Sequence, residues 1–120
     1  MTSPNDATRL RHMLDYWREA VQHAQGRSRA DLDADRLFEL AMTHLLEVIG
    51  EAAARVSQAT RDRYPQIPWS AIAGMRNRLI HGYDSVDFDI LWDVVRRDLP
   101  GLIAELEKIV PGTGREGEDS

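Results

Sequence analysis

The chain has 120 residues, of which 42% are apolar and 29% are charged, and this composition is ordinary for a single globular domain. It contains no cysteine, which excludes disulfides, thiolate metal sites and cysteine nucleophiles, and no apolar run approaches the roughly 20 residues of a membrane-spanning helix. The formal net charge of -5 argues against the broad basic face of a general nucleic-acid binder, although it leaves room for a small basic pocket. The first residues lack the basic-then-apolar layout of a secretion signal, so we expect the protein in the cytoplasm.

Capping residues predict where the first helix begins. Ser3 and Pro4, followed by Asp6, form a cap, a proline in the first turn and an acid near the helix N-terminus. Apolar residues then recur at helical spacing until Gly26, which is a plausible stop. The polar segment 28–37 that follows predicts a short turn or helix.

The strongest helical pattern covers residues 35–56. Its apolar stripe, which includes Met42 and Ile49, is wide enough for contact on more than one side, within a bundle or also with a second subunit. Gly50 lowers helix propensity in the middle of this segment, and a close helix crossing would explain it. The residues expected on the polar side of this helix are Glu39, Thr43, Glu47 and Glu51.

Two prolines in residues 62–68 must break that helix. The next helix is predicted over residues 69–80 and ends in a turn. Asp87 then caps a last helix, which reaches about residue 109 and is kinked or restarted at Pro100.

No segment alternates with period two, and no internal repeat is visible. The fold class expected is therefore all-α, a bundle of four to five helices in one domain over residues 1–110. The tail at residues 111–120 is rich in glycine and charge and contains no apolar side chain large enough for a core, so we expect it to be disordered.

The segment MRNRLIHGYD, residues 75–84, carries the most informative side chains. On a regular helix Arg76 falls in the middle of the apolar arc and Arg78 on the opposite, solvated side. A guanidinium in an apolar environment is costly without a partner. One interpretation is therefore a structural ion pair with a carboxylate of the preceding helix, for example Glu47 or Glu51.

His81 allows a second interpretation. A histidine at a helix C-terminus interacts well with the helix dipole, but histidine and arginine together are also what RNA cleavage without a metal requires. Arginine can hold a phosphate, histidine can exchange protons, and the ribose 2′-hydroxyl of the RNA supplies the nucleophile. On a regular helix Arg76 and His81 are about 140° and about 7.5 Å apart. They converge if the helix unwinds or if a second chain contributes its own copies, so we expect a dimer with a composite site.

The pattern formed by Arg76, Asn77, His81 and Tyr83 resembles the R-x4-6-H signature of HEPN domains, and more closely the R-x4-H-x-Y form of the HepT-like proteins. The segments LLEVIGEAA, YPQIPWSAIAGMRNRLIHGY and VDFDILWDVVRRDLP are similar to the same family. The resemblance covers roughly residues 6 to 109 in all.

This resemblance implies an all-α HEPN-type bundle that forms a homodimer, with the motif residues in a cleft at the interface. We expect the dimer to form through the helices carrying Met42, Ile49 and the motif. It implies the toxin of a type VII toxin–antitoxin system that is a metal-independent ribonuclease acting on RNA. Arg76 and His81 match the catalytic pair, and Asn77 matches a polar position that shapes the site. The implied partner is an MNT-type nucleotidyltransferase antitoxin that silences the toxin by transferring AMP to the tyrosine, here Tyr83.

Other functions remain open from the sequence. One is a non-catalytic dimeric module that binds a nucleotidyltransferase, and another is a helical dimer with an Arg76 ion pair and no site. An acidic set could bind a hard metal ion, but its members are expected instead to complement the start of the last helix: Asp84, Asp87, Asp89 and Asp93. We expect no metal and no cofactor.

Overall fold

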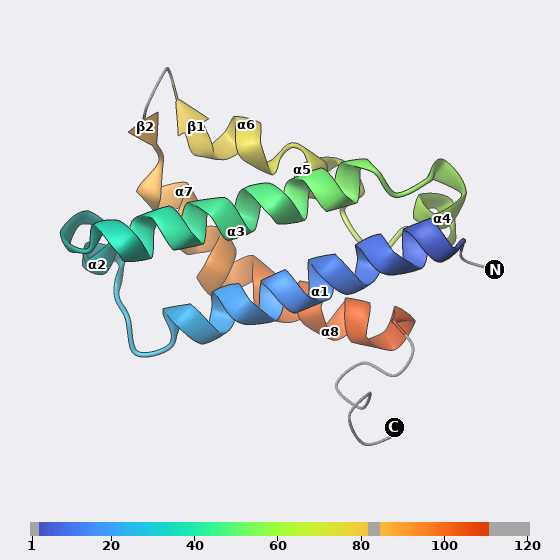
Figure 1. Cartoon of the computed structure of the whole chain (residues 1–120), viewed down its shortest axis with the longest axis horizontal. Coiled ribbons are helices and arrows are strands. Elements are labelled where there is room, and N and C mark those ends of the chain that lie inside the picture. The colour runs from blue at the N-terminus through green and yellow to red at the C-terminus, as the bar shows by residue number, and fades with distance from the viewer. Residues whose placement is uncertain (1–2, 82–84, 111–120) are drawn as a thin grey trace.

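The computed structural model describes residues 3–81 and 85–110. Two long helices, α1 (Pro4–Ala24) and α3 (Arg36–Ala54), lie side by side and run in opposite directions, while α7 and α8 lie behind them (Figure 1). The start of α1 therefore lies beside the end of α3. No helix in the described ranges is long and apolar enough to cross a membrane.

The remaining elements are α2 (Arg29–Ala34), α4 (Gln58–Arg63), α5 (Trp69–Ala73), α6 (Met75–Leu79), β1 (Ile80–His81), β2 (Ser85–Val86), α7 (Phe88–Asp93), the π-helix η1 (Val94–Asp98) and α8 (Leu99–Ile109). The expected all-α class is confirmed. The exception is the short antiparallel ladder of β1 and β2, in which Ile80 pairs with Val86 and His81 with Ser85.

The first helix begins and ends as its capping residues predict. The Ser3 side chain accepts a hydrogen bond from the Asp6 backbone N–H, and Gly26 just beyond the helix has a φ of 74°. The Asp6 carboxylate is itself buried. It accepts hydrogen bonds from the Ser57 backbone N–H at 3.0 Å and from the Thr60 hydroxyl at 2.6 Å. These bonds attach the start of α1 to α4.

The core lies between α1, α3 and the C-terminal helices. Its fully buried large side chains are Trp17, Met13, Leu14, Leu32, Met42, Leu46, Ile49, Ile67, Ile72, Leu79, Leu91 and Leu99. Met42 and Ile49 thus belong to the core of the chain itself. A contact between two chains through α3 must use other residues of this helix.

The prediction of which α3 residues face solvent is partly wrong. Glu39 and Thr43 are buried, because α3 is contacted by α1, α2, α5 and α6 and leaves little of its circumference to solvent. The Glu39 carboxylate is compensated by Arg36, whose Nη1 lies 2.7 Å from Glu39 Oε1. Periodicity identified these residues as polar but could not tell which neighbours would cover them.

The helix predicted over residues 69–80 is broken in two at Gly74, which ends α5 and precedes α6. The expected close crossing at Gly50 is confirmed at the same place. A Cβ on Gly50 would lie 3.0 Å from the backbone oxygen of Ile72 and 3.4 Å from the Cβ of Met75. Glycine at position 50 therefore lets α5 and α6 approach α3 closely.

The irregularity predicted at Pro100 takes the form of a π-helix. Proline has no backbone N–H to donate, and η1 ends just before it, with the Leu99 N–H donating to Val94 O, five residues earlier. The last predicted helix thus consists of α7, η1 and α8 in succession.

Candidate active site at the end of α6

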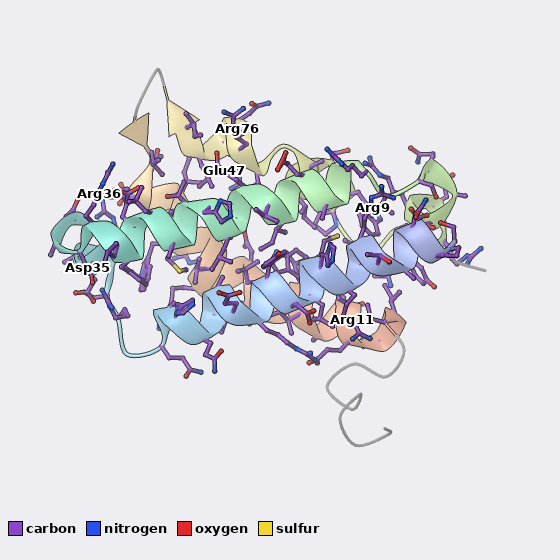
Figure 2. The ribbon with its side chains drawn as sticks, in the orientation of Figure 1. Arg9, Arg11, Asp35, Arg36, Glu47 and Arg76 are labelled. Carbon is purple, nitrogen blue, oxygen red and sulfur yellow. The ribbon has the colours of Figure 1, made fainter. Side chains whose placement is uncertain are left out.

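An ion pair joins the motif to the long helix beneath it. Arg76 on α6 donates from Nε to Oε2 of Glu47 on α3 at 3.2 Å. Figure 2 shows the two side chains extending toward one another from these helices. Of the two carboxylates expected as partners, Glu47 is therefore the one that pairs with Arg76. Glu51, one turn further along α3, lines a groove between α1 and α3 instead.

The expectation that Arg76 points into an apolar environment is wrong. Its side chain is 70% exposed, whereas that of Glu47 is 26% exposed. The helical wheel assumed an unbroken helix from residue 69, but the break at Gly74 changes the direction of α6 relative to α5. Arg76 thus leaves the apolar arc on which Trp69 and Ile72 remain buried.

Two polar neighbours of Arg76 on α6 also face solvent. Asn77 and Arg78 are both exposed, and for Arg78 this is the solvated position that the sequence predicts. Among the described residues neither side chain forms an ion pair or a hydrogen bond. Asn77 is therefore placed beside Arg76 with its amide available.

The backbone changes direction between Arg76 and His81. The helix α6 ends at Leu79, and residues 80–81 are extended in β1. The angular offset and rise that a continuous helix would impose therefore do not apply. The side chain of His81, and all of Tyr83, lie outside the described residues.

Two of the acidic residues after the motif, Asp87 and Asp89, serve local structure. Asp87 caps α7 by accepting a hydrogen bond from the Ile90 N–H at 3.0 Å, and Asp89 pairs with Arg29 Nε at 2.8 Å. Asp84 lies outside the described residues. In the part of the chain that the structure describes, no group of three or more His, Asp or Glu side chains could hold a metal ion.

Two large apolar residues are exposed near the start of α3. Leu37 is 79% exposed and Leu40 is 45% exposed, although both are large apolar residues. Leu40 and Glu47 are seven residues apart, which places them on the same face of the helix two turns from one another. These two leucines form the apolar patch of α3, and Leu40 shares its helix face with the Arg76–Glu47 pair.

Two arginines outside the motif were not predicted from the sequence as candidate site residues. Arg9 on α1 and Arg55 at the end of α3 line one groove. The available signal was their position at spacings of three and four residues from other polar residues, but such stripes also occur on ordinary solvated helices.

Comparison with known proteins places these features in a family. The profile of the ribonuclease HepT-like family matches residues 13–109, a range that includes the whole motif. The protein named "Putative RNase MJ1216" from Methanocaldococcus jannaschii is 31% identical over 111 residues, which are 92% of each chain. The protein named "Probable ribonuclease HepT" from Thermococcus cleftensis is 38% identical over 79 residues, 66% of this chain and 72% of the other. No solved structure gives a significant match.

Proposed function

The chain belongs to the ribonuclease HepT-like family, and on this premise we propose that it is an endoribonuclease that cleaves RNA without a metal ion. Arg76 and His81 are the catalytic residues of this proposal, and Asn77 supports the shape of the site. The biological role proposed is that of the toxin in a toxin–antitoxin pair.

The chemistry needs no nucleophile from the protein. The 2′-oxygen of a ribose attacks the adjacent phosphorus, and the bond from phosphorus to the 5′-oxygen of the next nucleotide breaks. The products are a 2′,3′-cyclic phosphate and a free 5′-hydroxyl. Histidine takes the proton from the attacking hydroxyl or delivers one to the leaving oxygen, and arginine holds the phosphate while negative charge builds on it.

The Arg76–Glu47 pair is the observation that carries this proposal. The bond engages Arg76 through Nε, and the side chain is 70% exposed, so the terminal Nη groups remain open to a phosphate. Glu47 also restricts the rotamers of a long side chain, which lowers the entropy lost when a substrate binds. A carboxylate that only neutralised a buried arginine would leave no such exposed face.

A second copy of the chain completes the site in this proposal. Burying the exposed leucines Leu37 and Leu40 against a partner would remove apolar surface from water. Because Leu40 shares a helix face with Glu47, a partner on this patch would also lie beside Arg76. Two motifs would then border one cleft.

Tyr83 is the proposed point of regulation. A cognate nucleotidyltransferase antitoxin would transfer AMP to its hydroxyl, adding bulk and negative charge two residues from His81. The adenylate would occupy the space that an RNA phosphate needs and could pair with Arg76.

The catalytic roles are tested by Arg76→Ala and His81→Ala, with Arg78→Ala as the matched control. Arg78 is an exposed arginine on the same short helix, so its loss changes the charge equally. Loss of a general acid–base group costs about 10²- to 10⁴-fold in rate, and we expect each motif variant to lose RNA cleavage while the control keeps it. Treatment with EDTA should have little effect.

Two results would contradict this assignment. Strong inhibition by EDTA would show that a metal ion is needed. Absence of cleavage by the unmodified protein, together with tight binding of the nucleotidyltransferase, would favour a non-catalytic binding module.

The regulatory role is tested by Tyr83→Phe, which keeps the ring and removes the acceptor oxygen. We expect the variant to cleave RNA at nearly the wild-type rate and to escape neutralisation by the transferase. Mass spectrometry should find adenylate on the wild-type peptide that contains Tyr83. A variant that is still silenced as well as wild type would refute the acceptor role.

The dimer is tested by measuring solution mass at micromolar concentration. We expect the wild type at twice its 13.6 kDa chain mass, and the double variant Leu37→Ser, Leu40→Ser as a folded monomer with much weaker cleavage. A wild-type monomer that cleaves RNA at full rate would rule out a composite site.

A further inference from the structure

The groove between α1 and α3 is a basic site in an acidic protein. It encloses about 380 Å³ and is lined from both sides. On α1 the lining residues are Asn5, Thr8, Arg9 and His12, and on the other side they are Val48, Glu51 and Ala52 of α3 and its C-cap residue, Arg55. In both sets the residues follow the pattern i, i+3, i+4 and i+7, so one continuous helical stripe on each side faces the groove.

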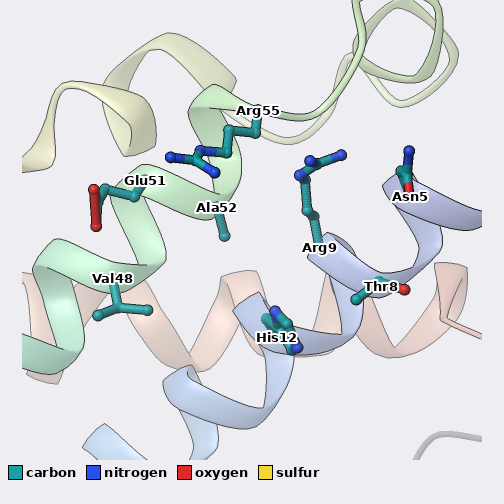
Figure 3. Close-up of a pocket in the computed structure, with 8 residues that line it drawn as sticks. All are labelled: Asn5, Thr8, Arg9, His12, Val48, Glu51, Ala52 and Arg55. Atoms are coloured by element: carbon teal, nitrogen blue, oxygen red, sulfur yellow. The ribbon is translucent and has the colours of Figure 1, made fainter.

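Neither arginine of this groove forms an ion pair among the described residues, although Arg9 lies close enough to Asp6 for its charge to help lower the pKa of that carboxyl. Arg9 is half-buried and Arg55 is exposed, and they stand on opposite walls of the groove (Figure 3). The single acid in the groove, Glu51, is not ion-paired with either of them. Other arginines do pair with carboxylates, namely Arg18, Arg27, Arg29, Arg36 and Arg76. Two guanidinium groups without an ion pair therefore line one groove, although the chain has a net charge of -5.

One wall of the groove is formed by α3, the helix that also carries Glu47, the partner of Arg76. Glu47, which binds Arg76, is one turn before Glu51 and two turns before Arg55 on α3. At 1.5 Å per residue, Glu47 and Arg55 are separated by about 12 Å along the axis. A nucleic-acid strand of a few nucleotides spans such a distance.

We propose that Arg9 and Arg55 form a second phosphate-binding site, which holds the backbone of single-stranded RNA in the α1–α3 groove while another phosphate of the same strand meets Arg76. The proposal rests on the proposed ribonuclease function for its choice of ligand. Guanidinium groups bind phosphate oxygens in forked pairs, and the amide of Asn5 adds a neutral donor on the α1 wall. Such contacts position a strand without reading its sequence.

Binding to an uncleavable probe tests the site separately from catalysis. The probe is a short single-stranded RNA with 2′-O-methyl ribose throughout, which lacks the attacking hydroxyl, and affinity is measured by fluorescence anisotropy over a range of salt concentrations. Arg9→Gln and Arg55→Gln should each weaken binding about threefold to tenfold, and each should reduce the slope of log K against log salt by about 0.7.

Two further variants separate a groove effect from a change in total charge. Lys108→Gln removes one positive charge from α8, outside the groove, and should leave the affinity for the probe nearly unchanged. Glu51→Gln removes the negative charge inside the groove and should tighten binding. Circular dichroism establishes that each variant keeps the helical fold.

Unmodified RNA then distinguishes the two proposals. Groove variants should raise KM with little change in kcat, because the contacts they remove hold substrate and transition state alike. If wild type cleaves RNA but the double arginine variant binds the probe with wild-type affinity and salt slope, the groove proposal is wrong and the ribonuclease proposal stands. If the arginines are needed for binding but RNA is never cleaved, the groove proposal stands and the ribonuclease proposal is wrong. A wild-type protein that does not bind the probe, or an equal loss in Lys108→Gln, also overturns the groove proposal.

Discussion

Replacing Gly50 by alanine tests how tightly α5 and α6 are held against α3. The new methyl carbon would lie 3.0 Å from the backbone oxygen of Ile72, well inside ordinary contact distance, and the obstacle is backbone that cannot rotate away. Overpacking of this kind costs about 1–3 kcal/mol, whereas replacing a glycine inside a helix gains about 0.5–1 kcal/mol. We expect the free energy of unfolding to fall by about 1–2 kcal/mol on balance.

Gly101→Ala is the matched control. Gly101 is also within a helix, but a Cβ there would meet nothing within 4 Å. Only the helix-propensity gain remains, so this variant should be more stable than wild type by about 0.5–1 kcal/mol. The same substitution should thus act in opposite directions at the two positions.

Urea unfolding followed by circular dichroism measures both effects. If the slope m is unchanged, the shift in midpoint reports stability alone. In thermal unfolding each kcal/mol corresponds to roughly 4 °C in Tm for a domain of this size. A Gly50→Ala protein that is as stable as wild type, with Gly101→Ala behaving as expected, would refute the close contact between α3 and α5. The Gly50 variant should also cleave RNA more slowly, because α6 carries the motif arginine.

Three other substitutions give distinct results. Burial acts to raise the pKa of the Asp6 carboxyl, but hydrogen bonds from Ser57 and Thr60 bring the pKa below its ordinary value. The stability that this carboxylate provides is therefore present at neutral pH and is lost as the pH falls below about 4. Asp6→Asn should lower the free energy of unfolding at pH 7 by about 1–3 kcal/mol. In urea titrations at several pH values, the variant should also lose less stability in acid than wild type does. Glu47→Gln should reduce kcat for RNA by loosening the motif arginine, yet change stability by less than about 1 kcal/mol, because the arginine of the pair is 70% exposed. The Thr43 hydroxyl is buried with no hydrogen-bond partner among the described residues, so Thr43→Val should raise Tm by an amount equivalent to about 1 kcal/mol.

Features that depend on neighbouring residues along the chain were predictable. The cap at Ser3, the stop at Gly26 and the cap at Asp87 follow from local hydrogen bonding and backbone preference, and each lies where the sequence places it. The helical period likewise identified most of the core, and the spacing of Arg76 and His81 identified the candidate site. All of these signals act within a few residues, so they are present in the sequence whatever the rest of the chain does.

The sequence determined which residues are apolar, polar or charged on each helix, but only the tertiary structure decided which of them solvent reaches. Periodicity reports the faces of one helix and carries no information on how many neighbours cover them. For this reason Glu39 was expected outside and is buried, while Arg76 was expected inside and is exposed after the break at Gly74. The groove that Arg9 and Arg55 line is a second example, because it forms only where two antiparallel helices bring together residues that are far apart in the chain.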